Sequence, residues 1–289
     1  MGVKLSKETS LELRLSLVST VAICAAGYAL IQKRRGDAIQ ETLNSRSDSG
    51  KRSFPSKIKL IYFQHEGRGE CIRLALFKAG IPFEDIRVSK ADGSFQALKP
   101  SLTFGQIPCL EVTQGGKTFQ LVQSAAILRY VAKLARDAPK PCNLYPEEPA
   151  TAALIDLIMD QQADTFAGLL VAKFPRRYGF YPEFMSEDIL TQALAAQNRE
   201  ILPKHLEKLD VLLSQSSTGW LANTKEPSIA DFMWVPFLNS ISNIDKPFSG
   251  DSALLCQFPQ LQDLQKRFMS QDFVCNWIAH RIQIMNSGG

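Results

Sequence analysis

Tyr62 is the residue whose type and position could do chemistry. The stretch Lys57–Phe63 begins with alternating polar and apolar residues and then turns apolar, which predicts a strand entering a core. Gly67 and Gly69 follow in a loop that opens a helix, so the tyrosine stands at a strand–loop–helix junction. A phenol hydroxyl in that position can donate a hydrogen bond to an anion. An aromatic core residue is the alternative interpretation of Tyr62.

The cysteines and histidines predict no metal centre. The three histidines are dispersed, and the six cysteines form no C-x-x-C pair and no cluster with histidine, which argues against zinc and against a thioredoxin-type redox pair. We therefore interpret the cysteines as reduced thiols. Because Tyr62, not a cysteine, occupies the first strand–helix junction, thiol transfer or peroxidase chemistry through a cysteine is the weakest hypothesis. The cysteines are Cys24, Cys71, Cys109, Cys142, Cys256 and Cys275.

The charge of the chain is concentrated at one end. Residues 1–59 hold eleven Lys or Arg and five Asp or Glu, a charge of +6, and the remaining residues sum to −2. The near-neutral body is not typical of a nucleic-acid binder, so no nucleic-acid partner is expected. The length of 289 residues and an apolar content of 45% suffice for two globular domains.

Residues 57–137 predict an α/β unit whose element order, β-α-β followed by β-β-α, is the thioredoxin-like arrangement. Ser124 is expected to cap the last helix of this unit. Because Pro108 cannot donate a ladder hydrogen bond at the start of its strand, we predict a cis Ile107–Pro108 bond. After the first strand, the predicted elements are a helix at Glu70–Lys78, a strand at Phe83–Val88, a short helical or irregular stretch at Gly93–Leu98, strands at Ile107–Val112 and Lys117–Val122, and a helix from Ser124 to about Ala135.

Three motifs carry a resemblance to a known family. They are Tyr62–Glu70 (YFQHEGRGE), Phe104–Val112 (FGQIPCLEV) and Gln123–Tyr130 (QSAAILRY). In this order and spacing they resemble the glutathione transferases, most nearly the sigma class, which includes the glutathione-dependent prostaglandin D synthases. The resemblance extends over roughly residues 57–281. It implies a thioredoxin-like α/β N-terminal domain followed by an all-α C-terminal domain.

The resemblance implies that Tyr62 and Arg68 are catalytic. Glutathione, the co-substrate, is a weak nucleophile until its thiol ionises, and a hydrogen bond to the thiolate lowers the thiol pKa. A drop of two pKa units requires only ~2.7 kcal/mol, which one or two donors can supply. Tyr62 would be this donor, and Arg68 would support the thiolate electrostatically. A solvated charge at the helix start is the other interpretation of Arg68.

The resemblance also implies how the glutathione backbone is held. The peptide would pair as an added strand with the main chain of Ile107, beside Pro108. Its γ-glutamyl carboxylate would lie at the helix start formed by Gln123 and Ser124, where unpaired N–H groups and the helix dipole favour an anion. A plain helix cap is the alternative role of Ser124, and one residue can fill both.

The glycine end of glutathione would be met by three further residues. Gln106 and Lys99 match family positions that reach the glycine carboxylate. Phe95 stands on the connecting segment where many family members have a Trp, and a Phe side chain donates no hydrogen bond. We therefore expect Phe95 to line the site without replacing that bond.

After a proline-rich connector, the pattern from about residue 147 onward is helical. The predicted helix Ala150–Leu170 carries Asp156, Asp160 and Asp164 at i, i+4 and i+8, a row of like charges that slightly destabilises an isolated helix. A solvated face is one interpretation. The resemblance implies instead that Asp164 reaches the γ-glutamyl amine across the interface of a twofold homodimer. Ala163 stands where the sigma pattern has another aspartate, so no metal effect is carried over.

The helical unit also predicts a helix cap and a pocket. Ser228–Asp231, after Pro227, is a capping-box variant with Asp in place of Glu or Gln, and it recurs in the helical domain of the family. The resemblance implies an apolar electrophile pocket between the two domains. Its candidate lining residues are Phe63, Phe166, Leu170 and Phe174.

Residues 1–56 predict a hydrophobic anchor and a linker. Leu15–Ile31 holds 17 residues without a charge, and Lys33–Arg35 follows as a basic stop. As a helix this run spans roughly 25 Å, against a hydrocarbon core of roughly 30 Å. The polar, Ser-rich stretch after Gln40 predicts a flexible linker. Membrane contact through residues 15–31 would leave the catalytic body facing the cytosol, on the endoplasmic reticulum or the mitochondrial outer membrane.

Other interpretations of this arm stay open. A buried core helix and a cleaved signal peptide are two alternatives. Met1–Ser6 also fits the pattern for N-myristoylation of Gly2. A segment that lies on the membrane instead of spanning it would reconcile a lipidated N-terminus with the basic cluster after the apolar run.

Two functions compete for the whole chain. The first is a membrane-tethered glutathione transferase whose thiolate attacks apolar electrophiles, with glutathione-dependent isomerase or peroxidase activity at the same site. The second is a non-catalytic binding or structural protein with the same fold, because fold alone does not confer activity. The presence of Tyr62, Arg68, Gln123 and Ser124 favours the enzyme. The predicted divisions are an anchor and linker at 1–56, a thioredoxin-like domain at 57–138 and a helical domain at 147–289.

Overall fold

The computed structural model describes residues 54–181, 183, 185–243 and 251–287. The chain divides into two compact units, Met1–Arg52 and Ser53–Gly289, and the second contains all the elements below. The predicted anchor at residues 15–31 and the predicted modification of Gly2 lie outside the described residues. Among the residues that are described, no helix combines the length and the hydropathy needed to cross a bilayer.

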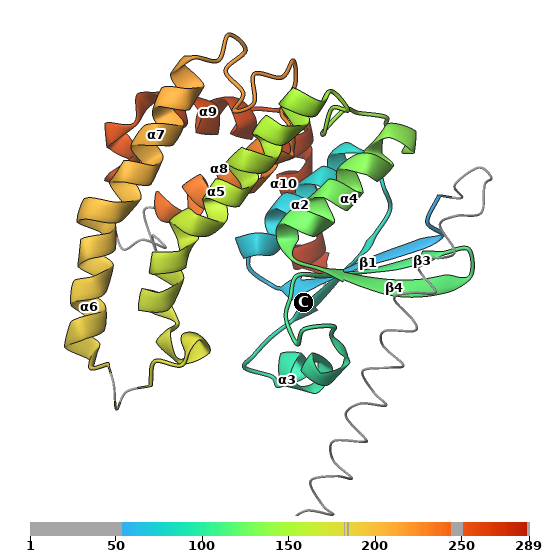
Figure 1. The fold of residues 1–289 in the computed structure, drawn as a ribbon. Helices are drawn as coiled ribbons and strands as arrows, with labels where there is room; N and C mark the ends of the chain where they lie inside the picture. Colours follow the sequence, from blue (N-terminus) through green and yellow to red (C-terminus); the bar gives the residue numbers. More distant parts are fainter. Residues whose placement is uncertain (1–53, 182, 184, 244–250, 288–289) are drawn as a thin grey trace, which may run out of the picture. The chain divides into compact units, whose positions relative to one another are not determined.

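A mixed four-stranded sheet organises the first half of the unit (Figure 1). β1 runs parallel to β2 and antiparallel to β3, and β3 pairs antiparallel with β4, in the order β2-β1-β3-β4. A parallel pair joined through a helix, followed by a hairpin, is the thioredoxin-like arrangement, so the predicted fold class is confirmed. The strands are β1 Lys57–Phe63, β2 Glu84–Val88, β3 Cys109–Gln114 and β4 Lys117–Val122.

Helices cover both faces of this sheet (Figure 1). α2 (Gly67–Lys78) and α4 (Ser124–Leu134) pack over one face with the side chain of Leu60, in the main core. α3 (Ser94–Leu98) lies on the other face, where Ile61 belongs to a second, smaller cluster. Successive side chains of a strand point to opposite faces. Tyr62 therefore faces α2.

The second half is helical, as predicted. α8 is mostly apolar and largely buried, and Trp234 within it is fully buried, as expected of a helix surrounded by others. Its indole N–H donates to the carbonyl of Ile158 in α5 at 2.7 Å, and α8 also packs against α2, so it joins the two halves. The helices are α5 Pro149–Lys173, α6 Glu187–Ala196, α7 Leu202–Ser214, α8 Ile229–Ile241, α9 Pro259–Met269 and α10 Asp272–Ser287. A π-helical segment, Gln197–Ile201, joins α6 to α7, and short 3-10 turns lie at Lys99–Ser101, Ala135–Asp137, Pro175–Tyr178 and Leu254–Gln257.

The predicted cap at the start of α8 is confirmed. The carboxylate of Asp231 accepts the backbone N–H and the hydroxyl of Ser228 at 2.8 and 3.1 Å, and the N–H of Leu221 at 2.9 Å. Complete burial raises the pKa of Asp231 to about 6, although these hydrogen bonds act in the opposite direction.

Several element boundaries differ from prediction by one to three residues, and three differences lie next to Tyr62, Pro108 and Gln123. β3 begins at Cys109 and not at Ile107, because Pro108 has no N–H for the ladder; the Ile107–Pro108 bond is cis, as predicted. α2 begins at Gly67, three residues earlier than expected. Ser124 is the first residue of α4 and not its cap, because Gln123 occupies the cap position and makes no side-chain capping bond. The division between residues 138 and 147 stays a prediction.

Candidate active site

Tyr62 lies against the first turn of α2. Its side chain is 6% exposed, and the backbone N–H of Arg68 donates to its hydroxyl oxygen at 2.9 Å. Two glycines permit this approach. A Cβ atom at Gly69 would lie 2.5 Å from Cδ1 of the ring, and one at Gly67 would lie 2.6 Å from the hydroxyl oxygen. Because the hydroxyl accepts from the Arg68 N–H, its own proton remains available for a ligand.

The Tyr62 phenol keeps its proton at neutral pH. Burial raises its pKa above the ordinary value, and this effect exceeds the opposing effects of the Arg68 N–H bond and of the Arg68 and Arg73 charges. A neutral phenol is a hydrogen-bond donor and not a base. Tyr62 can therefore stabilise an anion at the end of β1, but it cannot take up a proton from it.

Arg68 links the site to the helical half. The residue is half-buried, and its guanidinium carbon lies 5.4 Å from the ring centre of Phe166 in α5, within cation–π range. Phe166 in turn packs on Phe237 of α8, with ring centres 3.9 Å apart. The guanidinium is therefore held beside Tyr62 by an aromatic side chain from the other half of the unit.

A buried guanidinium holds the loop that joins β1 to α2. Arg73, 1% exposed, donates to the carbonyls of Phe63 and His65 at 3.1 and 3.3 Å. It is also paired with Asp85 of β2 at 3.0 Å and with Glu70 at 3.3 Å. Removing one member of such a buried set would leave an uncompensated charge. This set fixes the path of the backbone immediately after Tyr62.

The last helix completes the same network. Trp277 of α10 donates its indole N–H to Glu70 at 2.7 Å. Arg281, one turn later, donates to Glu70 at 3.3 Å and to Glu66 at 2.7 Å. α10 is thus bonded to the first turn of α2, the turn whose N–H meets the Tyr62 hydroxyl.

The sheet register brings three predicted site residues to one edge. Continuing the ladder by one residue places Tyr62, Pro108 and Gln123 at the ends of neighbouring strands, which lie about 4.8 Å apart. Ser124 begins α4 at the same edge. The last pairs of the β1–β3 and β3–β4 ladders at this edge are Ile61 with Cys109 and Cys109 with Val122.

Gln123 has an unusual backbone conformation. Its φ is 72° and its ψ 114°, a region that a residue with a Cβ rarely adopts. Such strain persists only where the surrounding structure imposes it, and it is common at ligand sites. The first turn of α4 has no side-chain capping bond, which leaves its N–H groups available to a carboxylate.

The residues predicted for the glycine end of glutathione differ in how exposed they are. Gln106 and Lys99 are exposed, and Ile107 is partly buried beside Pro108. Phe95 packs edge-on against Phe63, with ring centres 5.2 Å apart, in the small cluster on the α3 face. The structure gives Phe95 a packing contact, and its role toward a ligand stays a prediction.

The four residues predicted for an apolar pocket do not form one wall. Phe166 and Leu170 belong to the main core, 8% and 9% exposed, and Phe174 is 44% exposed. Phe63 lies in the other cluster, because it follows Tyr62 on the strand and points to the opposite face of the sheet. The prediction that these four residues line one pocket stays a prediction.

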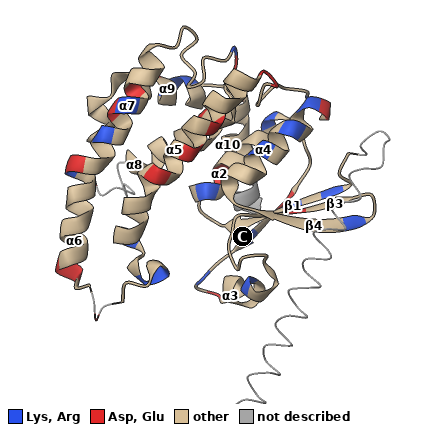
Figure 2. Cartoon of the chain, viewed as in Figure 1, with Lys and Arg blue, Asp and Glu red and all other residues tan. Residues whose placement is uncertain are grey.

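Acidic positions recur along α5 (Figure 2), and their partners differ. Arg129 of α4 pairs with Asp156 at 2.6 Å and with Asp160 at 3.2 Å, and Tyr145 donates to Asp156 at 2.8 Å. Asp164 is exposed. In the part of the chain that the structure describes, no group of three or more His, Cys, Asp and Glu side chains could hold a metal ion.

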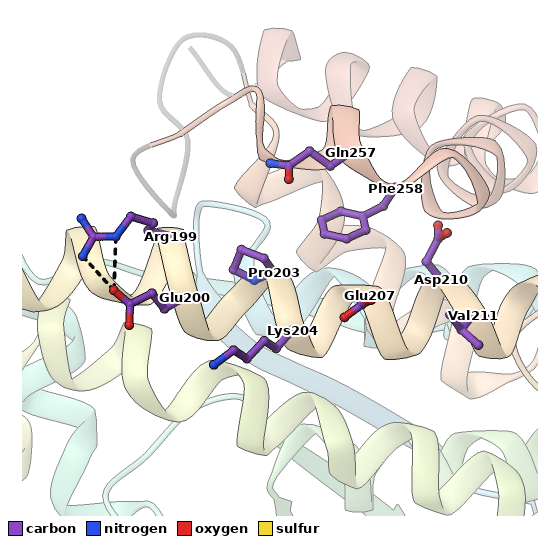
Figure 3. Close-up of a pocket in the computed structure, with 9 residues that line it drawn as sticks. All are labelled: Arg199, Glu200, Pro203, Lys204, Glu207, Asp210, Val211, Gln257 and Phe258. Carbon is purple, nitrogen blue, oxygen red and sulfur yellow. Dashed lines mark hydrogen bonds and ion pairs between the residues drawn. The ribbon is translucent and has the colours of Figure 1, made fainter.

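A hollow elsewhere on the molecule does not suit an apolar substrate (Figure 3). It measures about 490 Å³, lies along α7 and contains no residue of the Tyr62 site. Arg199 and Glu200 on its rim are paired at 2.8 Å. Its walls are largely charged, formed by Arg199, Glu200, Pro203, Lys204, Glu207, Asp210, Val211, Gln257 and Phe258.

Sequence reasoning missed the roles of four residues around Tyr62. The i, i+3 spacing of Glu70 and Arg73 could have indicated an ion pair on one helix face. His65 lies within the Tyr62–Glu70 motif, but the sequence alone does not show which residues surround it in space. Trp277 had no local signal, because its partner Glu70 is 207 residues away.

Comparison with known proteins agrees with this geometry. Residues 58–133 match the glutathione S-transferase N-terminal domain and residues 177–281 match the glutathione S-transferase C-terminal domain. Glutathione S-transferase 1 of Ascaris suum is 33% identical over 224 residues, covering 77% of this chain and 96% of that protein. Hematopoietic prostaglandin D synthase of Gallus gallus is 30% identical over 223 residues, with the same coverage.

A solved structure gives the same result. The glutathione S-transferase from Ascaris lumbricoides aligns with a TM-score of 0.59 at 31% identity, covering 78% of this chain and 97% of that one. Both domain models and full-length relatives at or above 30% identity thus agree with the thioredoxin-like and helical halves described above. The chain belongs to the glutathione S-transferase family.

Proposed function

We propose that this glutathione transferase activates the thiol of glutathione with the Tyr62 hydroxyl. The observation that carries the proposal is the buried, protonated phenol whose oxygen accepts the Arg68 N–H and whose proton remains available. A thiolate beside this proton would be favoured over the thiol, because the hydrogen bond is made to the charged form. Arg68 would add a positive charge on the same side.

The rest of glutathione would lie along the edge where β1, β3 and β4 end. The main chain of Ile107, beside Pro108, would pair with the cysteinyl residue of the ligand as an added strand. Gln123 and Ser124 would receive the γ-glutamyl carboxylate at the start of α4. For the glycine carboxylate we propose contacts with Gln106 and Lys99, and an apolar contact with Phe95.

We further propose a twofold homodimer that shares its sites. Asp164 is exposed on α5 and makes no described bond to Arg129, unlike Asp156 and Asp160. This leaves its carboxylate available to the γ-glutamyl amine bound in a second subunit.

The electrophile would be apolar and would approach Tyr62 from the side of α5. Phe166 and Leu170 offer apolar surface there, next to Arg68. Relatives named prostaglandin D synthase support an isomerase reaction at the same site, in which the thiolate attacks and is later released. Glutathione-dependent peroxidase activity would use the same thiolate.

We keep the membrane tether as a proposal that rests on sequence alone. The uncharged run of residues 15–31 and the basic cluster after it support attachment, with the catalytic body facing the cytosol. Fractionation of cells that express the full chain or residues 54–289 would test it. Recovery of both forms in the same soluble fraction would exclude the tether.

A thiol titration tests the catalytic assignment. Bound glutathione is titrated by its thiolate absorbance in the wild type, in Tyr62→Phe and in Tyr145→Phe, which makes the same exchange away from the site. We expect the bound thiol pKa to lie about two units below that of free glutathione in the wild type and in Tyr145→Phe. In Tyr62→Phe it should return toward the free value. An equal pKa in all three proteins would contradict the proposal.

A further inference from the structure

The ring of His65 lies beside the Tyr62 hydroxyl. A Cβ atom at Gly67 would lie 2.6 Å from the hydroxyl oxygen and 3.1 Å from Nε2 of His65. The two atoms are therefore no farther apart than these distances laid end to end, about 5.7 Å. Hydrogen-bond reach between heavy atoms is about 3 Å, so one sulfur atom can contact both groups.

Two aromatic neighbours pack against the ring of His65. It stacks on Phe63, with ring centres 5.4 Å apart at 15°, and meets the Tyr62 ring edge-on at 5.7 Å. The backbone carbonyl of His65 accepts a hydrogen bond from the buried Arg73. The residue is nevertheless exposed, so its nitrogen atoms can exchange protons with water.

The proposed function does not assign the group that accepts the thiol proton. When the bound thiol ionises, Tyr62 cannot take the proton, because it already carries one. Arg68, Arg73 and Lys90 carry N–H donors and offer no acceptor. Glu66 is paired with Arg281 at 2.7 Å. Among the described side chains around the hydroxyl, the imidazole is the remaining basic group.

We infer that His65 accepts the thiol proton of glutathione as the thiolate forms. The S–H bond breaks, its electron pair stays on sulfur, and the proton forms a new N–H bond on the imidazole. The product is a thiolate hydrogen-bonded to Tyr62 beside a His65 imidazolium. The thiolate then attacks the electrophile, and the imidazolium returns its proton to water. The inference rests on the proposed function, since it needs a thiolate at Tyr62.

The charges around His65 suit this role. Partial desolvation of the ring lowers the pKa of its imidazole below the ordinary value, and Arg73 and Lys90 lower it further, against an opposing effect of Glu66. The ring is therefore neutral near pH 7 before glutathione binds and can accept a proton. A thiolate next to it then favours the imidazolium, as in cysteine–histidine pairs.

The test measures how many protons are released to solvent for each thiolate that forms. The full-length wild type, His65→Gln and His205→Gln are mixed with glutathione in weak buffer at pH 6.5. Thiolate is followed by its absorbance and released protons by an indicator dye. His205→Gln makes the same exchange on α7, where His205 contacts Gln161. S-methylglutathione, which has no thiol, gives the proton release due to the rest of the ligand.

In His65→Gln we expect about one proton to be released for each thiolate formed, because the proton must enter solvent. In the wild type and His205→Gln the ratio should be below about one half, because the imidazole retains the proton. A wild-type ratio near one overturns the role of His65, and this measurement needs no variant. If thiolate forms, depends on Tyr62 and shows a ratio near one, the proposed function stands and only this inference fails. If the wild type forms no thiolate, both fail.

Discussion

The backbone N–H of Arg68 points at the hydroxyl oxygen of Tyr62 from 2.9 Å. The first N–H groups of a helix have no partner within the helix, so α2 uses one of them to orient the phenol. A backbone donor cannot rotate away as a side chain can. The direction in which the hydroxyl proton points is thereby set by the start of α2, and α2 is held in turn by Arg73 and by α10.

Gly69→Ala should damage catalysis without touching a ligand. The new Cβ would lie 2.5 Å from the Tyr62 ring, so the ring must move away from its place under α2. We expect a loss of about 1–3 kcal/mol in unfolding free energy, typical of overpacking. We also expect at least a tenfold fall in kcat/KM with an aryl halide. Urea unfolding and steady-state kinetics measure the two effects.

Gly168→Ala is the matched control for this change. Gly168 is also a helical glycine, but its new Cβ would meet the end of the Gln197 side chain, which can rotate. Activity should stay within about twofold of the wild type, because no site residue moves. Equal losses in both variants would show that the Tyr62 contact has no special importance.

Gln123→Gly should separate stability from ligand binding. Glycine adopts φ near 72° without strain, so unfolding free energy should stay unchanged or rise by up to about 1 kcal/mol. KM for glutathione should rise roughly tenfold if the side chain contacts the ligand. Asn223→Gly, also at positive φ, should lose stability at constant KM, because the Asn223 side chain accepts the N–H of Ser217.

Asp164→Asn and Asp160→Asn form a matched pair on α5. Only the first should raise KM for glutathione, by roughly tenfold, because Asp164 is proposed to meet the amine bound in a second subunit. Asp160 binds Arg129 at the surface, so its loss should cost less than about 1 kcal/mol of stability. Sedimentation of the wild type should show a dimer. A monomer with full activity would contradict the shared site.

Asp231 predicts an unusual dependence of stability on pH. Its folded pKa of about 6 exceeds the unfolded value of about 3.9, so between them the folded state holds more protons. Stability from this group is therefore greatest at low pH and falls as pH rises, by about 3 kcal/mol in all. The stability of the wild type relative to Asp231→Asn, which cannot ionise, should decrease between pH 4 and pH 7.

Urea unfolding at several pH values measures this difference, in which the contributions of all other groups cancel. The opposite trend is a wild type whose stability relative to Asp231→Asn increases as pH rises. It would mean that the hydrogen bonds from Ser228 and Leu221 affect the Asp231 pKa more than burial does. In that case the folded pKa of Asp231 would lie below its ordinary value.

Trp277→Phe should loosen α10. The change removes the donor to buried Glu70 and should cost about 1–3 kcal/mol of unfolding free energy. Trp220→Phe is the size-matched control, because Trp220 is also buried but its described contacts are with the rings of Phe268 and the guanidinium of Arg267. Hydrogen exchange should show faster opening of residues 272–287 only in Trp277→Phe. Equal losses of unfolding free energy in both variants would show that the hydrogen bond to Glu70 does not stabilise α10.

Much of this protein follows from local sequence patterns. The strands at 57–63 and 117–122 were predicted to the residue, because alternation and turn residues act within a few positions. The cis bond at Pro108 and the cap at Asp231 were predicted for the same reason, since each depends on chemistry within three residues. The motif around Tyr62 pointed to the family because its residues are contiguous.

Contacts between distant residues were decided only by the tertiary structure. Trp277 and Glu70 are 207 positions apart, and nothing in either sequence neighbourhood refers to the other. The pleat of β1 turns Phe63 to the face of the sheet opposite Tyr62, where it packs with Phe95 in the small cluster. Ser124 was expected to cap α4, but the strained backbone of Gln123 takes that position. His65 lies close to the Tyr62 hydroxyl because the buried Arg73 is hydrogen-bonded to the His65 carbonyl and so fixes the loop between β1 and α2. A sequence encodes such contacts through packing and charge pairing over the whole fold, and these act only once the chain is compact.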